Sequence, residues 1–112
     1  MIKYGLIGLG AACGGMARFA IATSLPLPFP WQTFVINFTG GALIGFLANR
    51  LQGDSRYFWI TGICGGYTTF STFSIEVVTL LEQGRYALAA SYIFISVALC
   101  VAAAAATYHW TK

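Results

Sequence analysis

Hydroxyl and aromatic side chains are interleaved in residues 68–74, which read TTFSTFS. Hydroxyl groups donate hydrogen bonds, so several of them together can replace the water around a small anion. The edge of an aromatic ring carries partial positive charge. Phe70 and Phe73 are three residues apart and would share one face of a helix. Ring edges would attract an anion, whereas a cation prefers ring faces, so the pattern predicts a path for a small, strongly hydrated anion.

Other neutral polar side chains lie inside apolar stretches, where they need hydrogen-bond partners. These groups are Asn37, Thr39, Thr61, Thr68, Thr69, Ser71, Thr72, Ser74, Ser91, Tyr92 and Ser96. The Asn37 amide can donate to an anion as the hydroxyls can. A Ser or Thr in a membrane helix also bonds to its own backbone, and that interpretation stays open for each hydroxyl taken alone. The clustering in residues 68–74 favours the anion path there.

Gly65 and Gly66 precede Thr68 and Thr69, which predicts an interruption of the third helix at mid-membrane. Such a break frees backbone carbonyl groups, and membranes tolerate it only where protein, water or an ion satisfies them. If two copies of the chain met at the break, four carbonyl groups could hold a monovalent cation. A continuous glycine-rich helix crossing is the alternative.

Two charged residues lie close to this segment. Arg18, at the end of the first apolar stretch, can extend to the lipid headgroups or draw anions toward a pore mouth. Glu76 follows the hydroxyl row by two residues. It can be a proton or cation site, face a wet vestibule or pair with an arginine.

Composition indicates the protein class that must position these groups. Hydrophobic residues make up 58% of the 112 residues and charged residues only 8%, against about 25% in average soluble domains. A soluble fold of this length cannot bury so much apolar surface. We therefore expect one all-α integral membrane domain over residues 1–112, with membrane lipid around it. The net charge of +3 comes from scattered residues, so no basic patch predicts nucleic-acid binding.

About 20 apolar residues cross a bilayer as a helix. The four predicted spans are residues 4–24, 31–49, 57–81 and 86–110. Four spans place both termini on one side, and the Lys and Arg distribution favours a cytoplasmic side only weakly, which is compatible with insertion in both orientations. A cleaved signal peptide is the alternative for the first span, although its apolar run is closer to span length.

Small residues four apart let membrane helices approach closely. Three glycine pairs have this spacing: Gly10 with Gly14, Gly41 with Gly45, and Gly62 with Gly66. They indicate either packing within the chain or a dimer interface. A four-helix chain of this size has little interior for an aqueous path, so we expect a homodimer.

The cysteines are Cys13, Cys64 and Cys100, all within apolar stretches and without a CxxC pattern. This distribution indicates packing residues rather than a disulfide framework or a zinc site. No catalytic residues are predicted, and an enzyme is not expected.

Three motifs occur in order along the chain: Gly14-Gly15-x-x-Arg18, Thr33-x-x-x-Asn37-x-x-Gly40, and residues 62–76, which read GICGGYTTFSTFSIE. Over nearly the whole chain the sequence resembles the fluoride channels of the Fluc (CrcB-type) family. The resemblance implies an antiparallel, dual-topology homodimer in the bacterial plasma (inner) membrane. It also implies two fluoride pathways and passive export of fluoride that entered the cell as HF.

The resemblance further implies roles for individual residues. The implied pathway residues are Asn37, Phe70, Ser71, Thr72, Phe73, Tyr92, Ser96, Arg18 and Glu76. Phe70 and Phe73 resemble the ring-edge ligands of fluoride, and Asn37 resembles a pore-lining amide. The carbonyl groups of Gly65 and Thr68 match the positions that hold a central structural Na⁺. Tyr92 and Ser96 match hydroxyl positions of the fourth helix more loosely, and Cys100 follows where some members have a hydroxyl.

Two other protein classes fit a short four-span chain. A small multidrug-resistance-type, proton-coupled exporter is also dimeric, but it needs a carboxylate at the membrane centre. The first span has no carboxylate, and Glu76 lies toward a helix end. A non-transporting membrane subunit would not explain donors, ring edges and a helix break within one segment.

Overall fold

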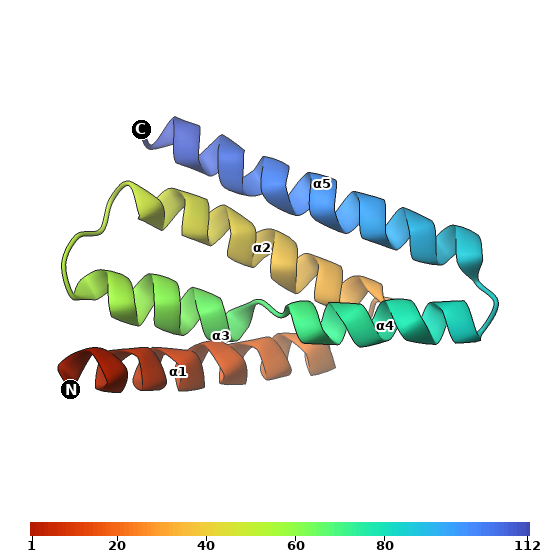
Figure 1. The fold of residues 1–112 in the computed structure, drawn as a ribbon, viewed down its shortest axis with the longest axis horizontal. Coiled ribbons are helices and arrows are strands. Elements are labelled where there is room, and N and C mark those ends of the chain that lie inside the picture. The colour runs from red at the N-terminus through yellow and green to blue at the C-terminus, as the bar shows by residue number, and fades with distance from the viewer.

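The computed structural model describes all 112 residues and contains only helices and their connections (Figure 1). The helices are α1 (Ile2–Ser24), α2 (Trp31–Ala48), the π-helix η1 (Tyr57–Cys64), α3 (Gly65–Tyr67), α4 (Phe70–Glu82) and α5 (Tyr86–Trp110). The all-α class expected from the composition is confirmed.

Residues that disfavour a helix separate these elements. The connection between α1 and α2 contains three prolines, which cannot donate a backbone hydrogen bond. Gly53 and Gly84 have positive φ angles of 66° and 74° in the two later turns, a conformation that glycine adopts without strain. α1, α2 and α5 are long and apolar enough to cross a membrane. The segment between Gly53 and Gly84 is divided among η1, α3 and α4.

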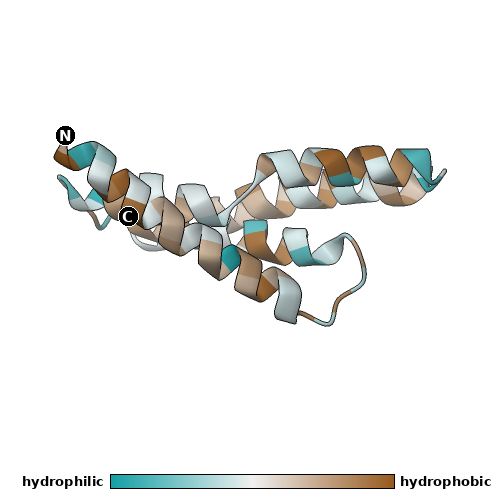
Figure 2. Cartoon of the chain, turned by 90° about the horizontal axis from the view of Figure 1, so that it is seen from below, coloured by the Kyte–Doolittle hydropathy of each residue, from teal (hydrophilic) through white to brown (hydrophobic).

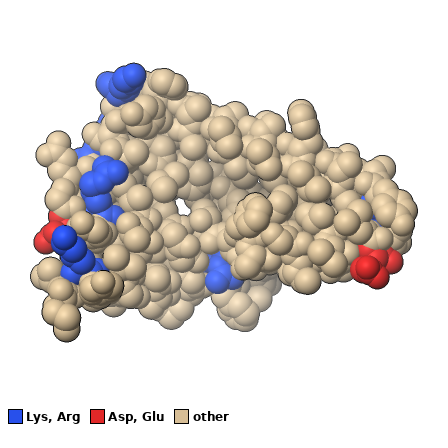
Figure 3. Space-filling view, in the orientation of Figure 1, with Lys and Arg blue, Asp and Glu red and all other residues tan.

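The helices lie along one long axis, within extents of 47 × 28 × 23 Å. α1 packs against η1 and α3, α2 packs against α5, and α4 continues past the interruption to contact α5 (Figure 1). Both termini lie at the same end of the molecule. Hydrophilic residues gather mainly at the two ends (Figure 2), and most Lys and Arg side chains lie at the end that holds the termini (Figure 3).

Little of the chain is buried within itself. Only 14 of the 112 residues are buried, and the core cluster contains just Phe73, Leu80, Ala89 and Tyr92. Many large hydrophobic side chains on α1, α4 and α5 remain exposed. Extended apolar surface of this kind suits lipid or another protein surface.

The three glycine pairs serve contacts inside the chain. A Cβ added at Gly62 would lie 2.8 Å from the Cα of Gly10, and one at Gly66 would lie 2.5 Å from the carbonyl oxygen of Ala11. Gly41 faces α5 in the same way. The glycines therefore let α1 approach η1–α3 and let α2 approach α5. These glycines do not form a dimer interface, because each of them already faces a neighbouring helix of the same chain.

Gly10→Ala is expected to destabilise the fold by about 1–3 kcal/mol, as overpacking usually does. Its Cβ would lie 2.9 Å from the Cα of Gly62, where no flexible side chain can move away. Unfolding in detergent, followed by circular dichroism, measures the change. Gly8→Ala is the matched control, because no atom lies within 4 Å of its added Cβ. Equal stability of the two variants would contradict close packing of α1 on η1.

Candidate functional site

The helical path between α3 and α4 stops at two threonines. Thr68 has φ −83° and ψ 157°, and Thr69 has φ −150° and ψ 123°, so both backbones are extended. β-Branched residues suit this conformation, and the glycines before them hold a helix only weakly. The Thr69 hydroxyl then accepts the Thr72 N–H at 3.2 Å, which caps the start of α4.

The Asn37 side chain of α2 supports the interrupted backbone. Its Oδ1 accepts the Thr69 N–H at 2.9 Å, and its Nδ2 donates to the Thr69 carbonyl oxygen at 3.1 Å. One amide thus satisfies both backbone groups of a residue that has left the helix. A second Nδ2 hydrogen remains for another acceptor.

The break leaves several carbonyl groups without their helical donors, among them those of Gly65 and Thr68. In a continuous helix Thr69 would donate to Gly65, and Thr72 would donate to Thr68. Here the Thr69 N–H donates to Asn37, and the Thr72 N–H donates to the Thr69 hydroxyl. The carbonyl oxygens of Gly65 and Thr68 are therefore available to another donor or to a cation.

Arg18 contacts the same segment from α1. Its Nε donates to the Gly66 carbonyl oxygen at 3.3 Å. The side chain thus brings one positive charge to the glycines before the break. Arg18 therefore contacts the protein itself and does not only extend toward the lipid headgroups.

Glu76 of α4 is bonded to two hydroxyl groups rather than to an arginine. Its Oε2 accepts from Thr33 of α2 at 2.8 Å, and its Oε1 accepts from Tyr92 of α5 at 2.7 Å. Thr33 and Tyr92 are both buried. The sequence left open that Glu76 pairs with an arginine, and the structure has no such pair.

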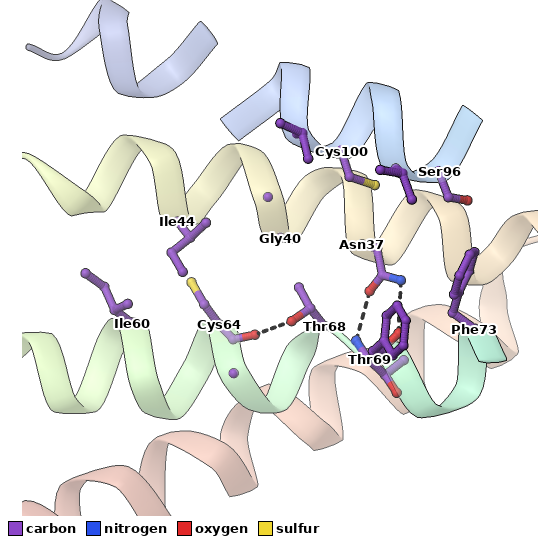
Figure 4. A pocket seen from close by; sticks show the side chains of 15 residues that line it. Asn37, Gly40, Ile44, Ile60, Cys64, Thr68, Thr69, Phe73, Ser96 and Cys100 are labelled. Atoms are coloured by element: carbon purple, nitrogen blue, oxygen red, sulfur yellow. Dashed lines mark hydrogen bonds between the residues drawn. The ribbon is translucent and has the colours of Figure 1, made fainter. Parts of the chain in front are cut away.

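A pocket of about 400 Å³ lies beside the break, between α2, η1–α3, α4 and α5 (Figure 4). Of the residues expected at the site, it is lined by Asn37, Gly65, Thr68, Phe70, Phe73 and Ser96. The expected residues outside its lining are Arg18, Ser71, Thr72, Glu76 and Tyr92. The structure thus gathers the amide, the two rings and the freed carbonyl groups in one place.

The two phenylalanine rings differ in their surroundings. Their centroids are 5.5 Å apart, with planes inclined by 39°. Phe73 is 7% exposed and packs on Tyr92, with ring centroids 5.0 Å apart, whereas Phe70 is 76% exposed. Phe73 is therefore fixed by the core, and Phe70 projects from the surface of the chain.

Hydroxyl groups around the pocket are used in different ways. Ser74 donates back to the Phe70 carbonyl oxygen at 2.9 Å, and Ser71 lies 3.3 Å from the Thr69 hydroxyl. Ser96 lines the pocket, and its buried hydroxyl has no hydrogen-bond partner. A buried hydroxyl normally has a partner, so the Ser96 hydroxyl lacks a bond that its burial within the chain would call for.

Comparison with known proteins identifies the family. The family described as "CrcB-like protein, Camphor Resistance (CrcB)" matches residues 5–108. The chain belongs to the CrcB-like family. It is therefore a multi-pass membrane protein and not an enzyme.

Curated CrcB-like relatives carry the name "Fluoride-specific ion channel FluC". The relative from Paramagnetospirillum magneticum is 42% identical over 115 positions, covering 92% of this chain and 90% of its own. One from Coxiella burnetii is 43% identical over 110 positions, covering 88% and 89%. Another, from Agrobacterium fabrum, is 40% identical over 113 positions, covering 92% and 90%. The similarity thus spans the helices that build the pocket.

Sequence reasoning missed two residues of this CrcB-like site. The sequence places Thr69 among the hydroxyls and at the predicted break, but it does not predict that Thr69 caps α4 and bonds the Asn37 amide. Thr33 bonds Glu76. The sequence signals for Thr33 are its place in the motif Thr33-x-x-x-Asn37-x-x-Gly40 and its position one helical turn before Asn37, on the same face of α2.

Proposed function

We propose that this chain is a fluoride-selective channel through which fluoride leaves the cytoplasm passively. The observation that carries the proposal is the pocket at the helix break, where Asn37, Ser96 and the two phenylalanine rings converge. The names of the CrcB-like relatives support fluoride as the ion. Fluoride is small and strongly hydrated, so it needs several close donors to replace its water.

Two side chains near the pocket have hydrogen-bond donors that could replace this water. Asn37 retains one N–H beyond its bond to Thr69, and the Ser96 hydroxyl has no partner. The edges of Phe70 and Phe73 add partial positive charge without a full cation, so a passing anion is stabilised without being trapped. A larger halide fits a narrow ring-lined path poorly and makes fewer close bonds.

In the proposed assembly two copies pair as an antiparallel, dual-topology homodimer, with the breaks at mid-membrane. The exposure of Phe70 supports this pairing, since a ring that guides an anion needs protein on its other side. The small core and the extensive exposed apolar surface support it as well. Each copy then contributes its own pocket, which gives two fluoride pathways.

A structural Na⁺ at the dimer centre is part of the proposal. The carbonyl oxygens of Gly65 and Thr68 suit it, because their usual helical donors bond elsewhere. Two copies would supply four such oxygens. Bound there, Na⁺ would satisfy the carbonyl groups and join the two subunits.

The small multidrug-resistance-type exporter is less well supported. Proton-coupled exchange needs a carboxylate free to bind a proton or a cationic substrate. Both Glu76 oxygens accept hydrogen bonds from hydroxyl groups, and α1 contains no carboxylate. We therefore retain the proposal that this chain is a fluoride channel.

Purified protein in liposomes is expected to release fluoride rapidly once an ionophore carries the counter-ion. Chloride efflux should be slower by about a hundredfold or more, because losing two hydrogen bonds to a charged group costs about 3 kcal/mol. Ion-selective electrodes measure both rates. Protein-free liposomes are the control, and equal rates for the two halides would reject fluoride selectivity.

A further inference from the structure

Both extended residues of the helix break are held by α2. The Asn37 side chain bonds the N–H and the carbonyl oxygen of Thr69. Thr68 lies against Gly40, because a Cβ added at Gly40 would overlap the Cγ2 methyl group of Thr68. Both residues line the pocket beside the break (Figure 4). The missing side chain of Gly40 thus leaves a space on α2, the Gly40 notch, that receives this methyl group.

The Thr68 side chain is fixed at both of its branches. Its methyl group occupies the Gly40 notch, and its hydroxyl donates to the Cys64 carbonyl oxygen at 3.0 Å. The Thr68 N–H donates to the same oxygen, also at 3.0 Å. A β-branched side chain has few χ1 rotamers. These contacts together therefore fix the Cα of Thr68 and the direction in which the chain leaves the helix.

The peptide group between Thr68 and Thr69 is held by Asn37. This peptide group is trans, and a trans peptide group is planar, so its N–H and C=O point in opposite directions. The Thr69 N–H points to Oδ1 of Asn37, at 2.9 Å. The Thr68 carbonyl oxygen therefore points away from the Asn37 side chain. Gly40 and Asn37 together set the direction of a carbonyl group that has lost its helical donor.

We propose that Gly40 is a positioning residue for the carbonyl group of Thr68. By leaving room for the Thr68 methyl group, it holds Thr68 extended, with a ψ angle of 157°, and directs the carbonyl oxygen toward Na⁺. A side chain at position 40 would push Thr68 out of the notch and turn this oxygen. The effect on Na⁺ rests on the proposed function, whereas the contact between Gly40 and Thr68 does not depend on any ion.

Gly40→Ala is expected to raise the Na⁺ concentration that gives half-maximal stabilisation by at least about tenfold. Loss of a group that orients a metal ligand costs about 10–100-fold in affinity. Unfolding of the purified protein in detergent measures the change, with N-methyl-D-glucamine replacing Na⁺ at constant ionic strength. Gly10→Ala is the control for general destabilisation, since its added Cβ meets η1 and not the break. It should lower stability but leave the half-maximal Na⁺ concentration at the wild-type value.

The double variant Gly40→Ala/Thr68→Ser separates positioning from simple overpacking. Serine keeps the hydroxyl that bonds Cys64 and removes the methyl group that the new Cβ would overlap. The next atom, Cδ2 of Tyr67, lies 3.0 Å from that Cβ, in a ring that can shift slightly. The double variant should therefore regain the Na⁺ response, whereas Thr68→Ser should not restore the stability of Gly10→Ala. Failure of this rescue would overturn the role of Gly40, as would a similar loss of Na⁺ affinity in Gly10→Ala.

Hydrogen exchange of the Thr69 amide, followed by NMR, tests the Gly40 notch without an ion. In Gly40→Ala the bond from this amide to Asn37 should be lost, so exchange should be at least about fivefold faster, the effect of one hydrogen bond. Thr68→Ser in the same chain should restore slow exchange. Unchanged exchange in Gly40→Ala would reject the notch.

The two measurements fail separately. If Na⁺ does not stabilise the wild type, the proposed Na⁺ site is wrong, while the exchange rate of the Thr69 amide still decides whether Gly40 positions Thr68. If Gly40→Ala does not fold, recovery of folding in the double variant with Thr68→Ser decides the same question. A double variant that also fails to fold would overturn the proposed contact.

Discussion

Asn37→Asp is expected to abolish measurable fluoride flux. Like charges about 4 Å apart repel by about 4 kcal/mol at an effective dielectric constant near 20, which is about a thousandfold in anion occupancy. The substitution also turns the Nδ2 bond to the Thr69 carbonyl oxygen, now 3.1 Å long, into a contact between two acceptors. Efflux from proteoliposomes measures the loss.

Asn49→Asp is the matched control for this change. Asn49, just after α2, also donates its amide to a backbone carbonyl oxygen, that of Tyr108, at 2.7 Å. It does not line the pocket, so its variant should retain fluoride flux. Conduction by Asn37→Asp at the wild-type rate would remove Asn37 from the pathway. Similar losses in both variants would mean that the effect comes from folding rather than from charge.

The different roles of these two asparagines illustrate what the sequence can predict. Both are short amides, and the sequence alone indicates only that an amide within an apolar stretch needs partners. The Asn37 partner is 32 residues away on another element. Helix packing determines which backbone group it meets, and that information is not local.

The all-α class was predictable because it depends on averages. High apolar content and low charge exclude a soluble fold of this length, and prolines and Gly84 mark helix boundaries through local backbone geometry. The π-helix η1 has no such local signal. Its close approach to α1 at Gly10 and Gly62 is a tertiary contact.

The glycine pairs also show that the sequence does not identify which helices meet. Spacing of four indicates that a helix approaches closely, but it does not say whether that helix belongs to the same chain. In the structure the neighbours are within the chain. Likewise, the sequence leaves three interpretations of Glu76 open. Its bonds to Thr33 and Tyr92 form only because α2, α4 and α5 meet.

Phe70→Ile is expected to reduce fluoride flux about fivefold while leaving the packing within the chain unchanged. Isoleucine is apolar but has no electropositive ring edge, a contribution worth about 1 kcal/mol in aromatic contacts. Phe70 is 76% exposed, and surface substitutions usually change stability by less than about 0.5 kcal/mol. Efflux and unfolding in detergent are measured on the same preparation.

Phe73→Ile should lower both the fluoride flux and the stability of the fold, because the ring belongs to the core cluster and packs on Tyr92. The flux should again fall about fivefold, and stability should fall by about 1–3 kcal/mol as the packing changes shape. Phe94→Ile on α5 is the control, since Phe94 is 74% exposed and does not line the pocket.

The combination of the three variants separates conduction from packing. If Phe70→Ile loses flux without losing stability or dimer formation, the loss comes from the ring itself, because Phe94→Ile removes a similarly exposed ring elsewhere. Full flux in Phe70→Ile would reject the ring-edge mechanism. Reduced flux in Phe94→Ile would point to a general effect of surface aromatic rings, so the selectivity would then have to come from Asn37 and Ser96.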